Sequence, residues 1–242
     1  MIEVTALSKT FSGHPPVRAV DNLSFSVAPG EIYGLLGPNG AGKTTALRML
    51  ATLLSPDSGQ ARIAGNDLRD NSQGVRRSIG YLSASTGLYE RLTPREILLY
   101  FARLQQVEQP VRRCEDLIDR LGITDYAEQR CDALSTGMAQ KVSIARAIVH
   151  APPVLILDEP TSGLDVLVSQ TVLEFVEQAR DDGACILYST HVMSEAERLC
   201  DRIGILHEGR LLAEGSLDEL KERSGQPDLE GAFVHFVRGS AR

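Results

Sequence analysis

The sequence lacks an excess of positive charge. Its 242 residues carry a net charge of −7, which gives no broad attraction to nucleic acid or to anionic lipid. This balance argues against a non-specific binder of DNA or RNA. The chain can still bury a core, because 43% of its residues are hydrophobic and 24% are charged, as in globular proteins. Its length suits one large domain or two modest ones.

Paired cysteines, a signal peptide and long apolar runs are also missing. The four cysteines form neither a CxxC pair nor a zinc-type spacing with the five histidines, and we expect them to be reduced thiols. The N-terminus, MIEVTALSKTF, lacks the charged-then-apolar pattern of a secretory signal. No apolar run approaches the roughly 20 residues that a membrane span needs. We therefore expect a soluble chain whose membrane role, if any, is through a partner.

What the sequence does contain is alternation of strand-like and helix-like segments. Short apolar runs predict strands at 2–7, 23–27, 32–36, 60–64, 78–82, 154–160, 184–190 and 202–206. Periodic apolar residues predict helices at 43–54, 111–121, 138–150, 166–180, 192–200, 216–223 and, at the C-terminus, 228–237. Thr93, Pro94 and Glu96 predict another helix start with a capping box. The alternation predicts an α/β core with a mainly parallel sheet, into which a helix-rich segment of about 84–150 is inserted.

A glycine-rich loop, GPNGAGKTT, lies between the strand at 32–36 and the helix that begins at Lys43. This is the context that a phosphate-binding P-loop requires. The predicted nucleotide ligands are Gly37, Pro38, Asn39, Gly40, Ala41, Gly42, Lys43, Thr44 and Thr45. Backbone N–H groups would approach phosphate oxygens, Lys43 would supply a positive charge, and the Thr44 hydroxyl would bind Mg²⁺. The sequence thus predicts a P-loop NTPase core.

Two carboxylates end the apolar strand VLILDE. Asp158 is placed to hold Mg²⁺, as in a Walker B motif, and Glu159 is placed to polarise the attacking water. His191 follows a later strand, and by itself it is better explained as a structural histidine.

A second glycine-containing turn, LSTGMAQK at 134–141, opens a helix about a hundred residues after the P-loop. The P-loop, LSTGMAQK and LILDEP, in this order and spacing, resemble the ATP-binding subunit of ABC transporters over nearly the whole chain. The resemblance implies the ABC ATPase fold, with an antiparallel β part at the N-terminus. It also implies a head-to-tail dimer in which the second turn binds the ATP held by the other subunit's P-loop.

The same resemblance implies roles for individual residues. Phe11 matches the aromatic residue that stacks on adenine, and Ser135 and Gly137 match signature positions that reach the opposite ATP. Glu159 matches the catalytic carboxylate, and His191 matches the switch histidine that contacts the γ-phosphate. The segment 162–165, which ends at Asp165, matches the D-loop that crosses the dimer seam.

Two departures from the family pattern bear on coupling and substrate. Ala84 stands where the family usually has a glutamine that contacts Mg²⁺ and senses the membrane subunit. Thr136 and Met138 replace the more usual Gly and Gln of the signature. Both departures resemble the NatA-like group of sodium exporters, whereas related cassettes drive export of drugs, lipids or polysaccharides. We expect residues 89–91 to take part in coupling instead of Ala84.

Together these expectations describe an ATPase, with ATP and Mg²⁺ as ligands, that powers a membrane exporter. Residues 1–225 would form the ATP-binding domain and 226–242 a C-terminal tail. The expected partners are a second copy or a related cassette, and a separate permease that holds the chain at the cytoplasmic face of the inner (plasma) membrane. No nucleic acid partner is expected. The alternative is an ABC-type ATPase that acts on ribosomes or nucleic acid; a P-loop kinase or GTPase would leave LSTGMAQK unexplained.

Overall fold

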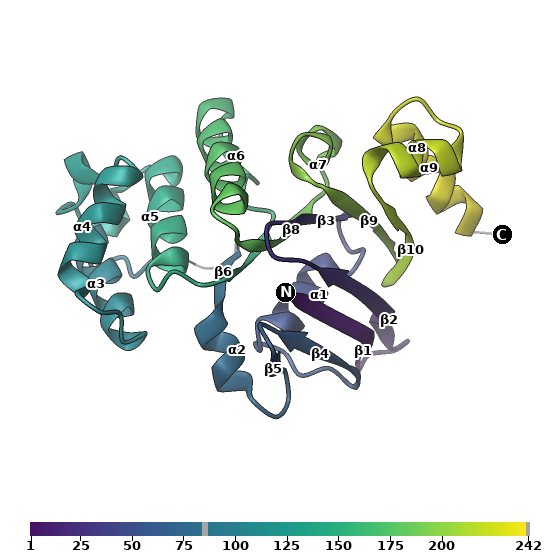
Figure 1. Ribbon diagram of the computed structural model, residues 1–242, viewed down its shortest axis with the longest axis horizontal. Helices are drawn as coiled ribbons and strands as arrows, with labels where there is room; N and C mark the ends of the chain where they lie inside the picture. The colour runs from purple at the N-terminus through teal and green to yellow at the C-terminus, as the bar shows by residue number, and fades with distance from the viewer. Residues whose placement is uncertain (84–86, 241–242) are drawn as a thin grey trace.

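The computed structural model describes residues 1–83 and 87–240, and contains two sheets flanked by helices (Figure 1). The N-terminal sheet is antiparallel. In spatial order its strands are β2 (Val17–Val27), β1 (Ile2–Phe11), β4 (Ser58–Ile63) and β5 (Asn66–Asp67). This antiparallel part agrees with the fold that the family resemblance implied.

The central sheet is parallel except at one edge. Its strands in spatial order are β10 (Arg210–Gly215), β9 (Arg202–His207), β3 (Ile32–Leu36), β8 (Cys185–Thr190), β7 (Val154–Asp158) and β6 (Ile79–Ser83). Only β10 runs antiparallel to its neighbour. Every residue of β3, β7 and β8 is buried, which explains why these strands consist largely of apolar residues. The predicted α/β class is confirmed.

Helix α1 (Lys43–Leu50) packs in the core that both sheets share. Its side chains Ala46, Leu47 and Leu50 are fully buried against residues of both sheets. The prediction that this helix continues to residue 54 is wrong. The chain leaves the helix after Leu50 because Thr52 adopts a left-handed backbone conformation, with φ of 61°, and Leu53 turns to solvent.

Three helices between β6 and β7 form a unit with its own core. They are α3 (Pro94–Leu104), α4 (Pro110–Arg120) and α5 (Thr136–Ile148). They lie at one end of the molecule and share buried residues such as Leu98, Leu117 and Val142 (Figure 1). The predicted capping box is confirmed: the Thr93 hydroxyl accepts from the Glu96 N–H, and the Glu96 carboxylate accepts from the Thr93 N–H.

The sequence reading misplaced some boundaries in this region. Helix α5 begins two residues before the predicted position, because Ser135 caps its N-terminus. Helix α2 (Ser72–Ser78) was not expected, and Ser78 belongs to it rather than to the following strand. Val75 is its only buried residue, so it shows no apolar periodicity.

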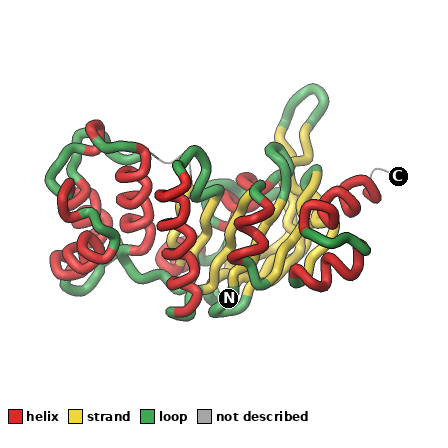
Figure 2. The backbone as a smooth tube through the Cα atoms, turned by 90° about the horizontal axis from the view of Figure 1, so that it is seen from above, coloured by secondary structure: helices red, strands yellow, loops and turns green. Residues whose placement is uncertain are grey.

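The remaining helices cover the central sheet and the C-terminal end. They are α6 (Val166–Asp181), α7 (Met193–Leu199), α8 (Leu217–Ser224) and α9 (Leu229–Ser240). The expected C-terminal helix is confirmed, since Leu229 and Ala232 are fully buried and α9 packs on α8 and β10. Helices α8–α9 and α3–α5 lie at opposite ends of the molecule, and the strands lie between the two groups (Figure 1 and Figure 2). Among the described residues, no helix combines the length and apolar character that crossing a bilayer would require.

Candidate functional site

The predicted chemistry-bearing residues gather at one edge of the central sheet. The P-loop follows β3, Glu159 follows β7, and His191 follows β8. Strand β8 lies between β3 and β7, and all three are parallel. Their carboxyl ends therefore meet at the same edge, which is the usual ligand position in open α/β sheets.

A cavity of about 340 Å³ lies over the P-loop. Seven of the nine predicted P-loop residues line it, from Asn39 to Thr45. Gly42 has φ of 106°, and a Cβ there would overlap the carbonyl oxygen of Ala19. Only glycine fits at this position, so the packing of the loop against β2 fixes its course above α1.

The Lys43 ammonium group is buried, with 4% of its side chain exposed. It donates to the carbonyl oxygens of Gly37 at 2.7 Å and Pro38 at 3.1 Å. It also pairs with the Glu159 carboxylate at 3.0 Å. The two P-loop residues that do not line the cavity thus hold the lysine that does.

Thr44 and Asp158 lie together beneath this cavity. The Thr44 hydroxyl donates to the Asp158 carboxylate at 3.2 Å. Ser189, fully buried on β8, donates to the same carboxylate at 2.8 Å and accepts from the Glu159 N–H at 3.1 Å. A hydroxyl and a carboxylate beside a lysine suit Mg²⁺, which prefers one or two protein oxygens plus phosphate oxygens. Among the described residues, no three His, Cys, Asp or Glu side chains are grouped so that they could hold a metal ion together.

Glu159 connects the P-loop residue Lys43 to His191. One carboxylate oxygen contacts Lys43, and the other lies 3.1 Å from Nδ1 of His191. Partial burial raises the pKa of the Glu159 carboxyl, but hydrogen bonds and charges from Lys43 and His191 lower that pKa by more, so it stays below its usual value. The carboxylate is therefore ionised at neutral pH, as a proton acceptor must be.

Strand β2 supplies residues that the sequence did not indicate. Val17, Arg18 and Ala19 line the P-loop cavity, together with Glu208 and Gly209 of the β9–β10 turn. Phe11, the expected adenine-stacking residue, pairs with Val17 across the β1–β2 ladder and is 42% exposed. An exposed aromatic ring beside the cavity is compatible with stacking on a base.

The second turn lies elsewhere, over a separate cavity of about 480 Å³. This cavity is lined by Ser135 and Gly137 from the start of α5 and by Asp165 from the start of α6. Ser135 accepts from the Met138 N–H at 3.3 Å, and Asp165 accepts from the Val168 N–H at 3.0 Å. Both residues are thus N-caps, and none of the three lines the P-loop cavity of the same chain.

Gly137 also has a packing role. A Cβ at this position would lie 2.6 Å from a methyl carbon of Val168, so α5 and α6 approach each other closely here. Ala84, where the family has its usual glutamine, lies outside the described residues.

Comparison with known proteins agrees with this geometry. The family model described as "ABC transporter" matches residues 20–162. Among curated proteins, the ABC transporter ATP-binding protein NatA of Bacillus subtilis is 41% identical over 99% of both chains. The daunorubicin/doxorubicin resistance ATP-binding protein DrrA of Streptomyces peucetius is 41% identical over 93% of this chain and 68% of its own length.

Solved structures show the same fold. An ATP-binding subunit of an ABC transporter superposes with a TM-score of 0.89 at 34% identity, over 98% of this chain and 99% of its own. A dimeric ATP-binding cassette in a post-hydrolysis state, bound to ADP and Pi, superposes with a TM-score of 0.82 at 25% identity. That match covers 90% of this chain and 99% of the cassette.

Proposed function

The chain belongs to the ABC transporter family as an ATP-binding, ATP-hydrolysing subunit, and from this premise we propose which residues perform each step. Lys43 and the P-loop backbone from Gly37 to Thr45 hold the phosphates of ATP. Phe11 stacks on adenine. The support is the cavity over the P-loop, with Phe11 paired to one of its lining residues.

We propose that Thr44 and Asp158 hold Mg²⁺, which would neutralise charge on the phosphate oxygens. Glu159 accepts the proton of the attacking water, and His191 orients Glu159 and reaches the γ-phosphate. In the structure Glu159 pairs with Lys43. A phosphate that binds Lys43 would compete for this contact, and one carboxylate oxygen of Glu159 would then be available to contact water.

The observation that carries the proposal is that one chain holds two incomplete sites. The P-loop cavity lacks a signature turn, and the signature cavity at Ser135, Gly137 and Asp165 lacks a P-loop. Two copies related by two-fold symmetry would complete two sites at once, because each copy supplies the half that the other lacks. We propose that ATP drives this head-to-tail dimer, formed with a second copy or with a related cassette.

Mixing two damaged subunits tests the shared sites. A Lys43→Ala subunit keeps its signature, and a Ser135→Arg subunit keeps its P-loop. Each homodimer has two damaged sites, whereas each mixed dimer has one intact site. An equal mixture should recover roughly a quarter of wild-type ATPase activity if the sites work independently. If neither activity nor ATP-dependent dimerisation returns, LSTGMAQK does not act across a dimer seam.

We propose that a separate permease holds the chain at the cytoplasmic face of the membrane. The docking surface is an exposed aromatic patch, Tyr89 and Tyr100, together with Glu90 and Arg91. Tyr89 and Tyr100 are 55% and 52% exposed, and their rings contact each other. Exposed aromatic clusters of this kind mark protein interfaces. We place the ATP-binding domain at 1–225 and the C-terminal segment at 226–242.

The transported substrate is proposed to be Na⁺, because the NatA relative matches this chain along its full length. Drugs are the second candidate, since DrrA is named for daunorubicin and doxorubicin resistance. A pull-down from a detergent extract should recover a permease. Sodium flux in vesicles with that permease would then decide the substrate. Recovery of ribosomes or nucleic acid in place of a permease would favour the alternative ATPase.

A further inference from the structure

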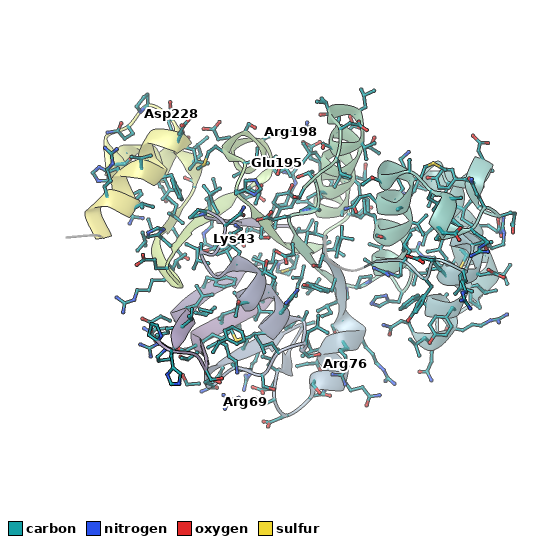
Figure 3. The ribbon with its side chains drawn as sticks, turned by 180° about the vertical axis from the view of Figure 1, so that it is seen from behind. Lys43, Arg69, Arg76, Glu195, Arg198 and Asp228 are labelled. Carbon is teal, nitrogen blue, oxygen red and sulfur yellow. The ribbon has the colours of Figure 1, made fainter. Side chains whose placement is uncertain are left out.

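The three residues after β7 are each tied to a different part of the chain. Glu159 pairs with His191, as described above. The Pro160 carbonyl accepts from the side-chain amide of Gln140 at 2.6 Å. The Thr161 hydroxyl donates to the Glu195 carboxylate at 2.6 Å. Glu195, which is labelled above Lys43 in Figure 3, also accepts from the hydroxyl of Thr190, the residue before His191.

The contact from Gln140 is the one that leads to the other ATP site. Gln140 lies on α5, five residues after the cap residue Ser135, so a single rigid helix carries both. Pro160 is buried, and Gln140 gives its carbonyl a partner that a buried acceptor requires. Since Pro160 directly follows Glu159, a displacement of α5 moves the backbone that carries the catalytic carboxylate.

We propose that Gln140 is a positioning residue that links the two ATP sites of the dimer. This rests on the proposed function, in which the N-terminus of α5 faces the partner's ATP while Glu159 serves the chain's own ATP. Contact of Ser135 with the partner's nucleotide fixes α5, Gln140 fixes Pro160, and Glu159 is set for hydrolysis. One site thereby reports its occupancy to the other through a single side chain.

The proposal predicts an effect that depends on which subunit carries the change. In a mixed dimer of a Glu159→Gln subunit with a subunit that keeps Glu159, both P-loops and both signature turns are intact, and only the second subunit hydrolyses ATP. Gln140→Met removes the amide donor while keeping the chain length. Placed in the hydrolysing subunit, it should lower turnover about 10-fold with little change in KM, since one charge-free hydrogen bond is worth that order of effect. Placed in the Glu159→Gln subunit, it should lower turnover less than about 2-fold, because that subunit has no catalytic carboxylate to position.

A purely structural role gives the other outcome. If Gln140 only supports the signature turn, the loss should be larger when Gln140→Met is in the Glu159→Gln subunit, whose signature faces the hydrolysing P-loop, or equal in both placements; either result overturns the proposal. Gln178→Leu on the exposed face of α6 is the matched control and should have no effect in either subunit. Circular dichroism and ATP binding by the isolated subunits check folding, and Gln140→Glu, which also lacks the donor, replaces Gln140→Met if that variant does not fold.

The homodimer provides a second readout. Wild-type ATPase should depend cooperatively on ATP concentration, and Gln140→Met should bring the Hill coefficient close to 1. An unchanged Hill coefficient above 1 would contradict the link between sites. Failure of the Lys43→Ala and Ser135→Arg subunits to form an ATP-dependent dimer on mixing would instead contradict the shared sites themselves, and the inference with them.

Discussion

Glu159 contacts both Lys43 and His191, and we propose that it determines the rate of hydrolysis rather than the affinity for ATP. We predict that Glu159→Gln keeps ATP affinity within a few-fold but lowers ATPase activity by roughly 10²–10⁴, the usual worth of a general base. The amide cannot accept the proton, although it keeps the shape of the side chain. Single-turnover hydrolysis and nucleotide binding separate the two effects.

Glu222→Gln, on the exposed surface of α8, is the control for this experiment and should behave as wild type. The Glu159→Gln protein should also form a longer-lived dimer with ATP. Near-normal hydrolysis by Glu159→Gln would remove this residue from the catalytic role.

Ser189 supports the same centre from inside the sheet. Its hydroxyl donates to Asp158 and accepts from the Glu159 N–H. Ser189→Ala should lower the free energy of unfolding by about 1–3 kcal/mol, because a buried carboxylate loses a donor. Urea unfolding measures this change. Titration of the ATPase activity with Mg²⁺ should show a weaker apparent affinity for the metal. Ser162→Ala, at an exposed serine in the loop after β7, is the control for stability. Equal stability of the two variants would mean that the Ser189 contacts contribute nothing.

At the scale of elements, glycine at position 137 has two possible explanations, which are the close contact between α5 and α6 and the approach to the partner's phosphate. Gly137→Ala should reduce ATPase activity, since its Cβ would lie 2.6 Å from Val168. If glycine is needed only for helix packing, adding Val168→Ala makes room and should restore most of the activity. If it is needed for approach to the partner's phosphate, the double variant should stay inactive. Activity of the single and double variants, with ATP-dependent dimerisation, decides between these outcomes.

The elements that the sequence predicted well are those whose signals are local. The capping box at Thr93 and Glu96 lies within four residues, and the buried strand VLILD is apolar up to its last residue, Asp158. Helix α2 escaped prediction because SQGVRRS has one buried residue and a glycine. The side chain of its N-cap residue, Asn71, accepts from the Gly74 N–H, so asparagine at this position is a local sequence signal for the helix start.

In the candidate site, too, the residues with local sequence signals are the ones that the sequence predicts. The P-loop, Asp158 and Glu159 are recognisable because each lies at the end of a strand or directly after it in the sequence. Ser189, Gln140 and the β2 residues that line the cavity act through contacts between distant segments. Ser189 reaches Asp158 across 31 positions of sequence, and nothing near Ser189 in the sequence indicates this partner. Predicting such contacts requires the order of the strands in the sheet, and the alternation of strands and helices along the sequence does not give that order.

At the scale of the whole molecule, we propose that the docking surface formed by Tyr89, Tyr100, Glu90 and Arg91 couples hydrolysis to transport. We predict that Glu90→Lys combined with Arg91→Glu abolishes stimulation of ATPase by the permease, because it reverses the charges at the proposed contact. Basal ATPase should be unchanged, since neither residue lines either nucleotide cavity. The measurement is ATPase of the reconstituted complex with and without transport substrate.

Glu222→Lys combined with Arg223→Glu makes the matching charge reversal on α8, at the opposite end of the molecule (Figure 1). It should leave stimulation intact. If the reversal at residues 90 and 91 also leaves stimulation intact, the permease binds another surface.

The position of β3 in the sheet has a consequence for how the protein is made. The P-loop has been synthesised by residue 45, yet β3 pairs only with β8 and β9, which begin at Cys185 and Arg202. At about 5–20 residues per second, translation needs roughly 7–30 s to supply those strands. During that interval the nascent chain carries a nucleotide motif without the sheet that shapes it. We therefore expect that ATP cannot assist folding of this motif before β8 and β9 have been synthesised.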